Sequence, residues 1–143
     1  MNIKSIKACL YSGLVFVGTV FHVLAADEPI LKIELNRLET IDGACVAYFV
    51  FRNSTARLYT EMQLDLVPFD KNELVLQRIA LNPAPITAKK TTVKLFELSR
   101  SSCANLGRVL VNEVVRCETY NGVVPDCIDQ LEFSSRTAVD LFR

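Results

Sequence analysis

The stretch that decides the fold is Cys45–Phe51, with the sequence CVAYFVF. It is apolar on both faces of an extended chain and rich in β-branched and aromatic residues, a composition that favours strands. The Asp42-Gly43 pair just before it is typical of a tight turn with positive φ angles. We therefore expect the most deeply buried strand of an all-β domain at this position.

The strand signal recurs on both sides of this segment. Leu31, Ile33 and Leu35 alternate with polar residues, which gives that segment one dry and one wet face. Further apolar runs, separated by turn residues, follow along the chain without a convincing helical period. The expected strands are residues 31–36, 45–51, 61–66, 74–81, 91–98, 107–117 and 131–136.

About seven short strands at this spacing predict a single immunoglobulin-like antiparallel β-sandwich, and a small β-barrel is the alternative. No repeat, low-complexity tract or long linker interrupts residues 27–143, so we expect one domain there. The chain has no tryptophan, and its cysteines are not placed as in antibody domains. The prediction therefore concerns architecture and not descent.

The N-terminus has the form of a secretory signal peptide, residues 1–26. Lys4 and Lys7 precede an apolar run, residues 8–24, which ends at Ala25 and Ala26. Cleavage after either alanine would release the mature chain into the periplasm or the medium, with no stable membrane insertion. The run is also close to the about 20 residues that span a bilayer, so retention as a membrane anchor is the alternative.

The composition of the mature chain excludes several classes of function. Loss of Lys4 and Lys7 leaves 16 − 2 = 14 basic residues against 16 acidic ones, a net charge of −2. Nucleic-acid binding is disfavoured, because it needs a basic face that displaces counterions. The only histidine, His22, leaves with the leader, and no phosphate-binding loop or nucleophile elbow is present. We expect no enzyme activity, no metal and no cofactor, and a carboxylate-dependent enzyme is the catalytic alternative.

Four cysteines remain in the mature chain: Cys45, Cys103, Cys117 and Cys127. Export and an even number favour structural disulfides over a metal or redox site. In the expected sandwich, Cys45 and Cys103 lie at one end, and Cys117 and Cys127 lie at the other. A Cys45–Cys117 link would have to span a whole strand, far beyond the about 7 Å that a disulfide allows between Cα atoms. The sandwich therefore predicts the pairs Cys45–Cys103 and Cys117–Cys127.

Binding is the function class that remains. The loops at residues 53–58 and 120–126 are expected at the same end of the sandwich, and arginine and tyrosine are enriched among interface anchors. The candidate partner-binding residues are Arg52, Arg57, Arg116 and Tyr120. We predict a binding module for another envelope protein. The competing interpretation is that the arginines are solvated residues at strand ends.

Strand addition at an exposed sheet edge is a second mode of binding, as in a chaperone or inhibitor. The run at residues 58–69 is a possible edge, although its charges and Pro68 are also typical of edges protected from pairing.

Two stretches of the chain resemble a known group of proteins. DGACVAYFVFRN (residues 42–53) and KKTTVKLFELSRSSCANLGRVLVNEVVRCE (residues 89–118) are similar to segments of small signal-peptide-bearing proteins of alphaproteobacteria. In that group a cysteine before a G-R-V-L-x-N strand and two cysteines after it recur. The resemblance implies a bacterial periplasmic setting, and it implies no particular activity.

Overall fold

The computed structural model describes residues 30–143, and its regular elements are nine strands and two short 3₁₀ helices. The leader expected at residues 1–26 lies outside the described residues. The elements are β1 (Leu31–Ile41), β2 (Ala44–Asn53), β3 (Tyr59–Asp70), β4 (Ile79–Leu81), β5 (Lys90–Ser99), η1 (Cys103–Asn105), β6 (Leu106–Thr119), β7 (Gly122–Val123), η2 (Cys127–Gln130), β8 (Leu131–Ser135) and β9 (Asp140–Phe142).

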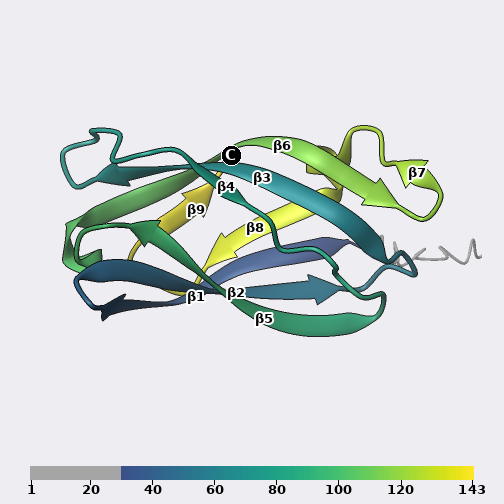
Figure 1. Ribbon diagram of the computed structural model, residues 1–143, viewed down its shortest axis with the longest axis horizontal. Helices are drawn as coiled ribbons and strands as arrows, with labels where there is room; N and C mark the ends of the chain where they lie inside the picture. Colours follow the sequence, from purple (N-terminus) through teal and green to yellow (C-terminus); the bar gives the residue numbers. More distant parts are fainter. Residues whose placement is uncertain (1–29) are drawn as a thin grey trace, which may run out of the picture.

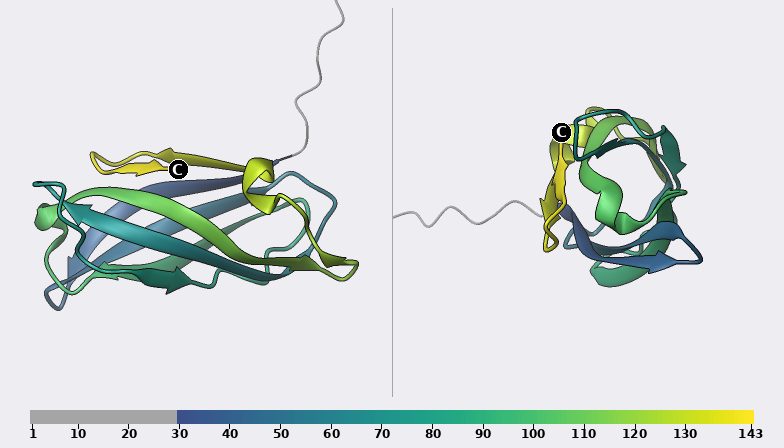
Figure 2. Two further views of the ribbon diagram at one scale, coloured as in Figure 1. Left: turned by 90° about the horizontal axis from the view of Figure 1, so that it is seen from above. Right: turned by 90° about the vertical axis from the view of Figure 1, so that its left-hand side faces the viewer.

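These strands form two sheets. The first has the order β5-β2-β1-β8, and the second has the order β4-β3-β6-β7, with β9 also pairing with β6. The sheets pack face to face in an elongated sandwich (Figures 1 and 2). The predicted all-β sandwich is confirmed, and the described chain does not form the closed barrel of the alternative.

The Cys45–Phe51 segment lies in β2, in the interior of the first sheet between β1 and β5. Cys45, Ala47, Phe49 and Phe51 point into the core and are at most 1% exposed. No residue of β2 is exposed, which agrees with the predicted depth of this strand. Burial of a phenylalanine side chain contributes about 1.5–3 kcal/mol, so Phe49 and Phe51 are major contributors to the stability of the domain.

The turn between β1 and β2 has the predicted geometry. Asp42 and Gly43 have φ angles of 50° and 84°, and the turn pairs Ile41 with Ala44. Further from the turn, β1 has a one-residue bulge at Asn36, since Leu35 and Arg37 pair with the consecutive residues Phe49 and Tyr48. Because side chains alternate between the faces of a strand, this bulge places apolar residues from both halves of β1 on the core side.

Two predictions about the second sheet are wrong. Residues 74–81 form a strand only in β4, and Val75 makes an isolated bridge with Phe69. The run at 58–69 is not an exposed edge. It pairs with β6 on one side, and on the other side with β4 and with Ile86 through Tyr59.

The last strands depart from an immunoglobulin-like order, which would place residues 131–136 antiparallel to β6 in the second sheet. Instead β8 pairs parallel to β1 in the first sheet. The chain then turns, with a 2.6 Å hydrogen bond from the Ser135 hydroxyl to the Val139 carbonyl, and β9 runs parallel to β6. The sandwich is therefore established, whereas the immunoglobulin-like description is not confirmed.

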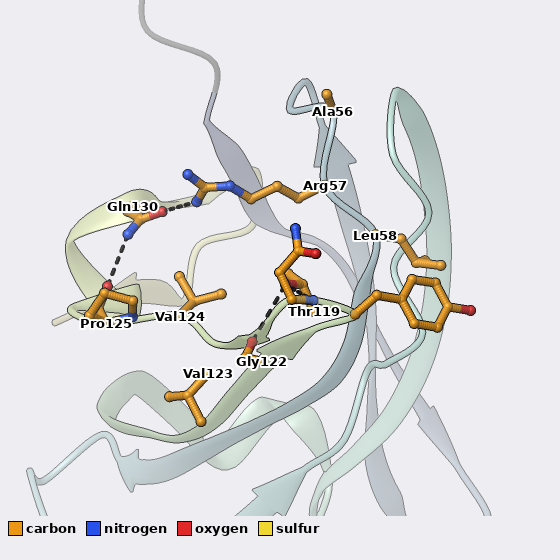
Figure 3. A pocket seen from close by; sticks show the side chains of 11 residues that line it. Ala56, Arg57, Leu58, Thr119, Gly122, Val123, Val124, Pro125 and Gln130 are labelled. Atoms are coloured by element: carbon orange, nitrogen blue, oxygen red, sulfur yellow. Dashed lines mark hydrogen bonds between the residues drawn. The ribbon is translucent and has the colours of Figure 1, made fainter.

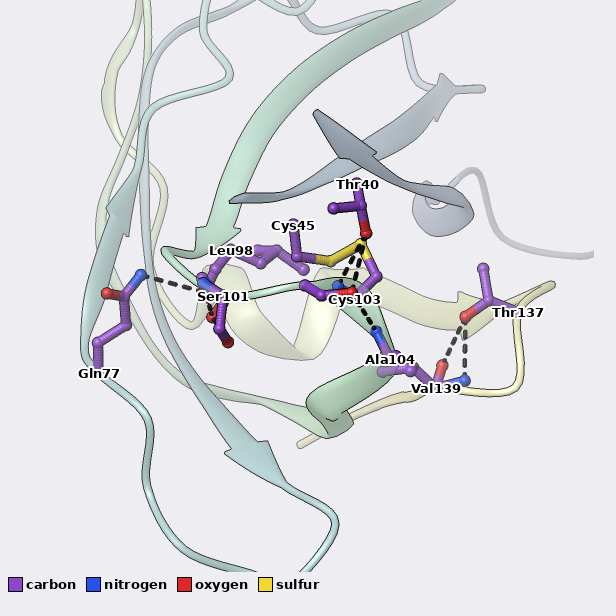
Figure 4. The surroundings of a disulfide bond; sticks show 11 residues. Thr40, Cys45, Gln77, Leu98, Ser101, Cys103, Ala104, Thr137 and Val139 are labelled. Carbon is purple, nitrogen blue, oxygen red and sulfur yellow. Dashed lines mark hydrogen bonds between the residues drawn. A yellow bond between two sulfur atoms is a disulfide. The ribbon is translucent and has the colours of Figure 1, made fainter. Parts of the chain in front are cut away.

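Two disulfides join the predicted pairs. Cys45–Cys103 and Cys117–Cys127 have Cα–Cα distances of 4.6 and 6.3 Å. Near the first, the Cys103 amide donates a 3.1 Å hydrogen bond to the Thr40 hydroxyl (Figure 4). Two disulfides fit an oxidising compartment outside the cytoplasm. Among residues 30–143, no helix has the length and apolar character needed to cross a membrane.

Candidate partner-binding end

Two loops that are distant in the sequence meet at one end of the sandwich, at the right in Figure 1. One is the β2–β3 loop, residues 54–58, and the other runs from the end of β6 to η2, residues 119–130. Together they line a hollow of about 540 Å³ (Figure 3). We call this region the loop end.

The buried side chain of Asn53 fixes the conformation of the β2–β3 loop through hydrogen bonds. Its buried side-chain amide donates hydrogen bonds to the carbonyls of Arg57 (2.8 Å) and Thr87 (3.1 Å). Its carbonyl oxygen accepts hydrogen bonds from the Thr55 amide (3.0 Å) and the Thr55 hydroxyl (2.7 Å). Because these buried polar groups are satisfied only in this arrangement, the loop is preorganised.

The second loop is fixed by the Cys117–Cys127 disulfide and by the short hairpin of β6 and β7. The Val124 amide donates a 2.9 Å hydrogen bond to the Cys117 carbonyl. Gly122 has a φ angle of 101°, which an L side chain rarely adopts, so a glycine is required in this turn. The hairpin therefore presents Tyr120 from a restrained base.

One hydrogen bond joins the two loops directly. The Arg57 guanidinium donates to the side-chain oxygen of Gln130, and the Gln130 amide donates to the Pro125 carbonyl at 3.0 Å (Figure 3). Arg57 forms no ion pair with any described residue. A guanidinium has five N–H donors, so donors remain for an acceptor on a partner.

Exposed apolar side chains accompany this cation. Tyr120 and Val123 are 83% and 75% exposed, the highest values among the large hydrophobic residues described. A tyrosine combines a large apolar area with a polar hydroxyl and loses little conformational entropy when it is ordered. Tyr120, Val123 and Arg57 together have the chemistry of an interface anchor.

The other two predicted site residues lie outside this hollow. Arg52, on the outer face of the first sheet, pairs with Glu34 at 3.0 Å, and Arg136 pairs with the same carboxylate at 3.2 Å. Arg116 lies along β6, 3.9 Å from Glu118. The structure thus brings Arg57 and Tyr120 together and separates them from Arg52 and Arg116.

Gln130 and Val123 are residues of the loop end that the sequence analysis missed. Gln130 contacts Arg57 across 73 residues, a distance over which no sequence pattern connects two polar side chains. Val123 belongs to a two-residue strand, which is too short to show an alternating pattern.

The buried carboxylates form structural ion pairs. Hydrogen bonds from Arg52 and then Asn36 lower the pKa of Glu34 to about 2. The pKa of Asp65 is lowered chiefly by its hydrogen bonds from Arg78, the shortest of which is 2.6 Å. Both groups are ionised at neutral pH, whereas a general acid needs a raised pKa. Within residues 30–143, no cluster of three or more histidine, cysteine, aspartate or glutamate side chains is arranged to hold a metal ion.

The sequence matches no protein-family model, and no curated protein matches it significantly. One solved structure, of IrmA from Escherichia coli, is similar to it with 14% sequence identity and a TM-score of 0.49. The match covers 76% of this chain and 92% of that chain. Similarity at this level identifies neither a shared family nor a shared function.

Proposed function

We propose that this protein is a non-catalytic binding module of the periplasm, and that it serves as an accessory to another envelope protein. The loop end is the recognition surface. The observation that carries the proposal is the exposure of Tyr120 and Val123 on a hairpin whose base is held by a disulfide. A restrained apolar surface loses little entropy on binding, which raises its affinity for a partner.

Arg57 supplies polar recognition beside this apolar surface. It lies in the wall of the same hollow, and only its hydrogen bond to Gln130 engages its guanidinium among the described residues. A partner that offers a carboxylate or a backbone carbonyl beside an apolar side chain complements this combination. The two disulfides and the export leader expected at residues 1–26 support the periplasmic setting.

Two observations favour binding over catalysis. The mature chain has no histidine, and its two buried carboxylates, Glu34 and Asp65, have lowered pKa values because arginines bind them. Both also lie away from the loop-end hollow, whose lining contains no carboxylate.

The test is capture of the partner by variants of the loop end. The partner is first identified by crosslinking in cells that export the tagged protein. We expect Tyr120→Ser and Arg57→Gln each to weaken its binding about five- to thirtyfold, because truncation of an interface anchor costs about 1–2 kcal/mol. Thermal unfolding of both variants should match the wild type, because both side chains lie at the surface.

Leu95→Ser and Arg100→Gln are the matched controls. Leu95 is exposed on β5, away from the loop end, and Arg100 is an exposed residue directly after β5. Both controls should bind the partner normally. If the Tyr120→Ser and Arg57→Gln variants bind the partner normally and the control variants do not, the loop end is not the recognition surface.

A further inference from the structure

The middle of β6 has an open edge. On the side away from β3, this strand of 14 residues pairs with β9 at residues 108–110 and with β7 at residues 118–119. No strand of the described chain pairs with residues 112–116 on that side, and no main-chain hydrogen bond from a described loop reaches them. The two covering strands lie toward opposite ends of β6 (Figure 1).

The outer edge of β5 also lacks a strand partner in the described chain, but side-chain hydrogen bonds join β5 to the segment that precedes it. There the Gln77 side chain donates a 3.1 Å hydrogen bond to the Leu98 carbonyl of β5, and the Lys94 ammonium donates to the Ala84 carbonyl at 3.3 Å. On β6, four of the five residues at 112–116 are exposed, and Val115 is 55% exposed. Within the described chain, the middle of β6 is therefore both unpaired on the side away from β3 and exposed.

A groove of about 380 Å³ follows this edge. One wall is β6, and the other is formed by Val123, Val124 and residues 126–128. Between the last residue paired with β9 and the first paired with β7 lie seven residues, or about 23 Å at 3.3 Å per residue. That length admits one short strand of five to seven residues.

The lining of the groove indicates the chemistry of its occupant. Glu113, Glu118 and Asp126 line it, and the only cation in the lining, Arg116, already lies 3.9 Å from Glu118. The apolar lining includes Val115 and Ile128. An extended segment that alternates apolar and basic residues complements both features.

Two bulges limit what can pair here. The register with β3 leaves Asn112 and Val115 without a partner, and each bulge adds twist and interrupts the ladder. Bulges of this kind disfavour regular association of long strands, including that of two copies of this chain. A short peptide segment can follow the local twist, so it is favoured over a second copy.

We propose that residues 112–116 of β6 bind a short, extended segment with alternating apolar and basic residues from a partner protein by strand addition. Main-chain hydrogen bonds to the open edge supply affinity, and the acidic groove selects basic side chains. This surface shares Val123 and Val124 with the loop end, whereas neither Arg57 nor Tyr120 lines the groove.

The test uses an acetylated, amidated peptide of eight residues in which valine and lysine alternate, titrated into the mature protein and followed by NMR amide exchange. We expect slower exchange of amides within 112–116. The same peptide with alternate backbone nitrogens methylated should not bind, because methylation removes the donors for strand pairing. A valine–glutamate peptide should bind at least tenfold more weakly.

A matched pair of variants tests the acidic lining. Glu113→Gln/Asp126→Asn should weaken peptide binding about 1.4- to fivefold per charge, the range for exposed ion pairs. The control Glu97→Gln/Asp42→Asn should leave peptide binding unchanged. Asp42 matches Asp126 because both have a positive φ near 50°, so the two Asp→Asn changes have a similar effect on the backbone. Tyr120→Ser should also leave peptide binding unchanged, which separates this site from the loop end. Equal binding of the methylated peptide, protection confined to other strands, or no binding at millimolar peptide would overturn the proposal.

Discussion

The two disulfides should contribute unequally to stability and to binding. The perturbation is removal of one link at a time, in the double variants Cys45→Ala/Cys103→Ala and Cys117→Ala/Cys127→Ala. Alanine is used in both, so that the loss of buried sulfur is similar in the two proteins. Cys45, Cys117 and Cys127 are buried and Cys103 is partly buried, so the two losses are close but not identical.

The expected magnitude follows from the loops that the links close. The sequence separations are 58 and 10 residues. In the chain-entropy description, loops of these lengths correspond to about 4.2 and about 2.7 kcal/mol at 25 °C. Loss of the Cys45–Cys103 link should therefore destabilise the domain by about 1.5 kcal/mol more than loss of the Cys117–Cys127 link.

Urea unfolding of the mature proteins, followed by circular dichroism, measures this difference. Binding of the partner should show the opposite order, because the Cys117–Cys127 link restrains the hairpin that carries Tyr120. Equal losses of unfolding free energy would refute the loop-length argument. A partner affinity more sensitive to the Cys45–Cys103 link would refute the assigned role of the other disulfide.

Three further changes have defined outcomes. Gly107→Ala should destabilise the domain by about 1–3 kcal/mol in thermal unfolding, because the added Cβ would lie 2.4 Å from the Asp70 carbonyl oxygen. Asn53→Ala should lower the unfolding free energy by about 2–3 kcal/mol and weaken partner binding, because it leaves buried main-chain groups unpaired and frees the loop of Arg57; normal stability would contradict this. The pKa of Glu34 is lowered from 4.5 to about 2, so its ionised form stabilises the fold fully above pH 4.5, and this stabilisation is lost as the pH falls toward 2. Glu34→Gln should remove that part of the pH dependence of urea unfolding, and an unchanged acid profile would argue against the ion pairs.

Much of the first sheet is predictable because its signals are local. The CVAYFVF segment defines β2, and Asp42-Gly43 defines the turn that pairs Ile41 with Ala44. An unbroken ladder from that turn would place Glu34 opposite Phe51, on the core side. The bulge at Asn36 instead pairs Glu34 with Val50, so its carboxylate faces outward beside Arg52. No sequence pattern indicates the bulge, so the ion pair between Glu34 and Arg52 could not be predicted from the sequence.

The position of the last strands is not predictable from local pattern. The sequence alternation of residues 131–135 is compatible with pairing to either β1 or β6. Contacts between distant residues decide between the two partners. One of these joins Arg136 to Glu34 across 102 residues. In the described chain, β7 and β9 pair with the two ends of β6 and leave its middle unpaired on the side away from β3. Because these pairings join distant residues, the open edge could not be predicted from the sequence either. Arg57 and Tyr120 could be chosen by residue type, because loops at the same end of a sandwich meet whatever their sequences.

The most direct test of the account is site-specific crosslinking in cells that export the protein. A photoreactive amino acid replaces Tyr120 in one variant and Leu95 in another, and the adducts are separated by mass. We expect one dominant adduct of a single envelope protein from position 120, lost when the Cys117–Cys127 link is removed, and no such adduct from position 95. Absence of an adduct at position 120, or the same adduct from both positions, would contradict a binding module that acts through its loop end.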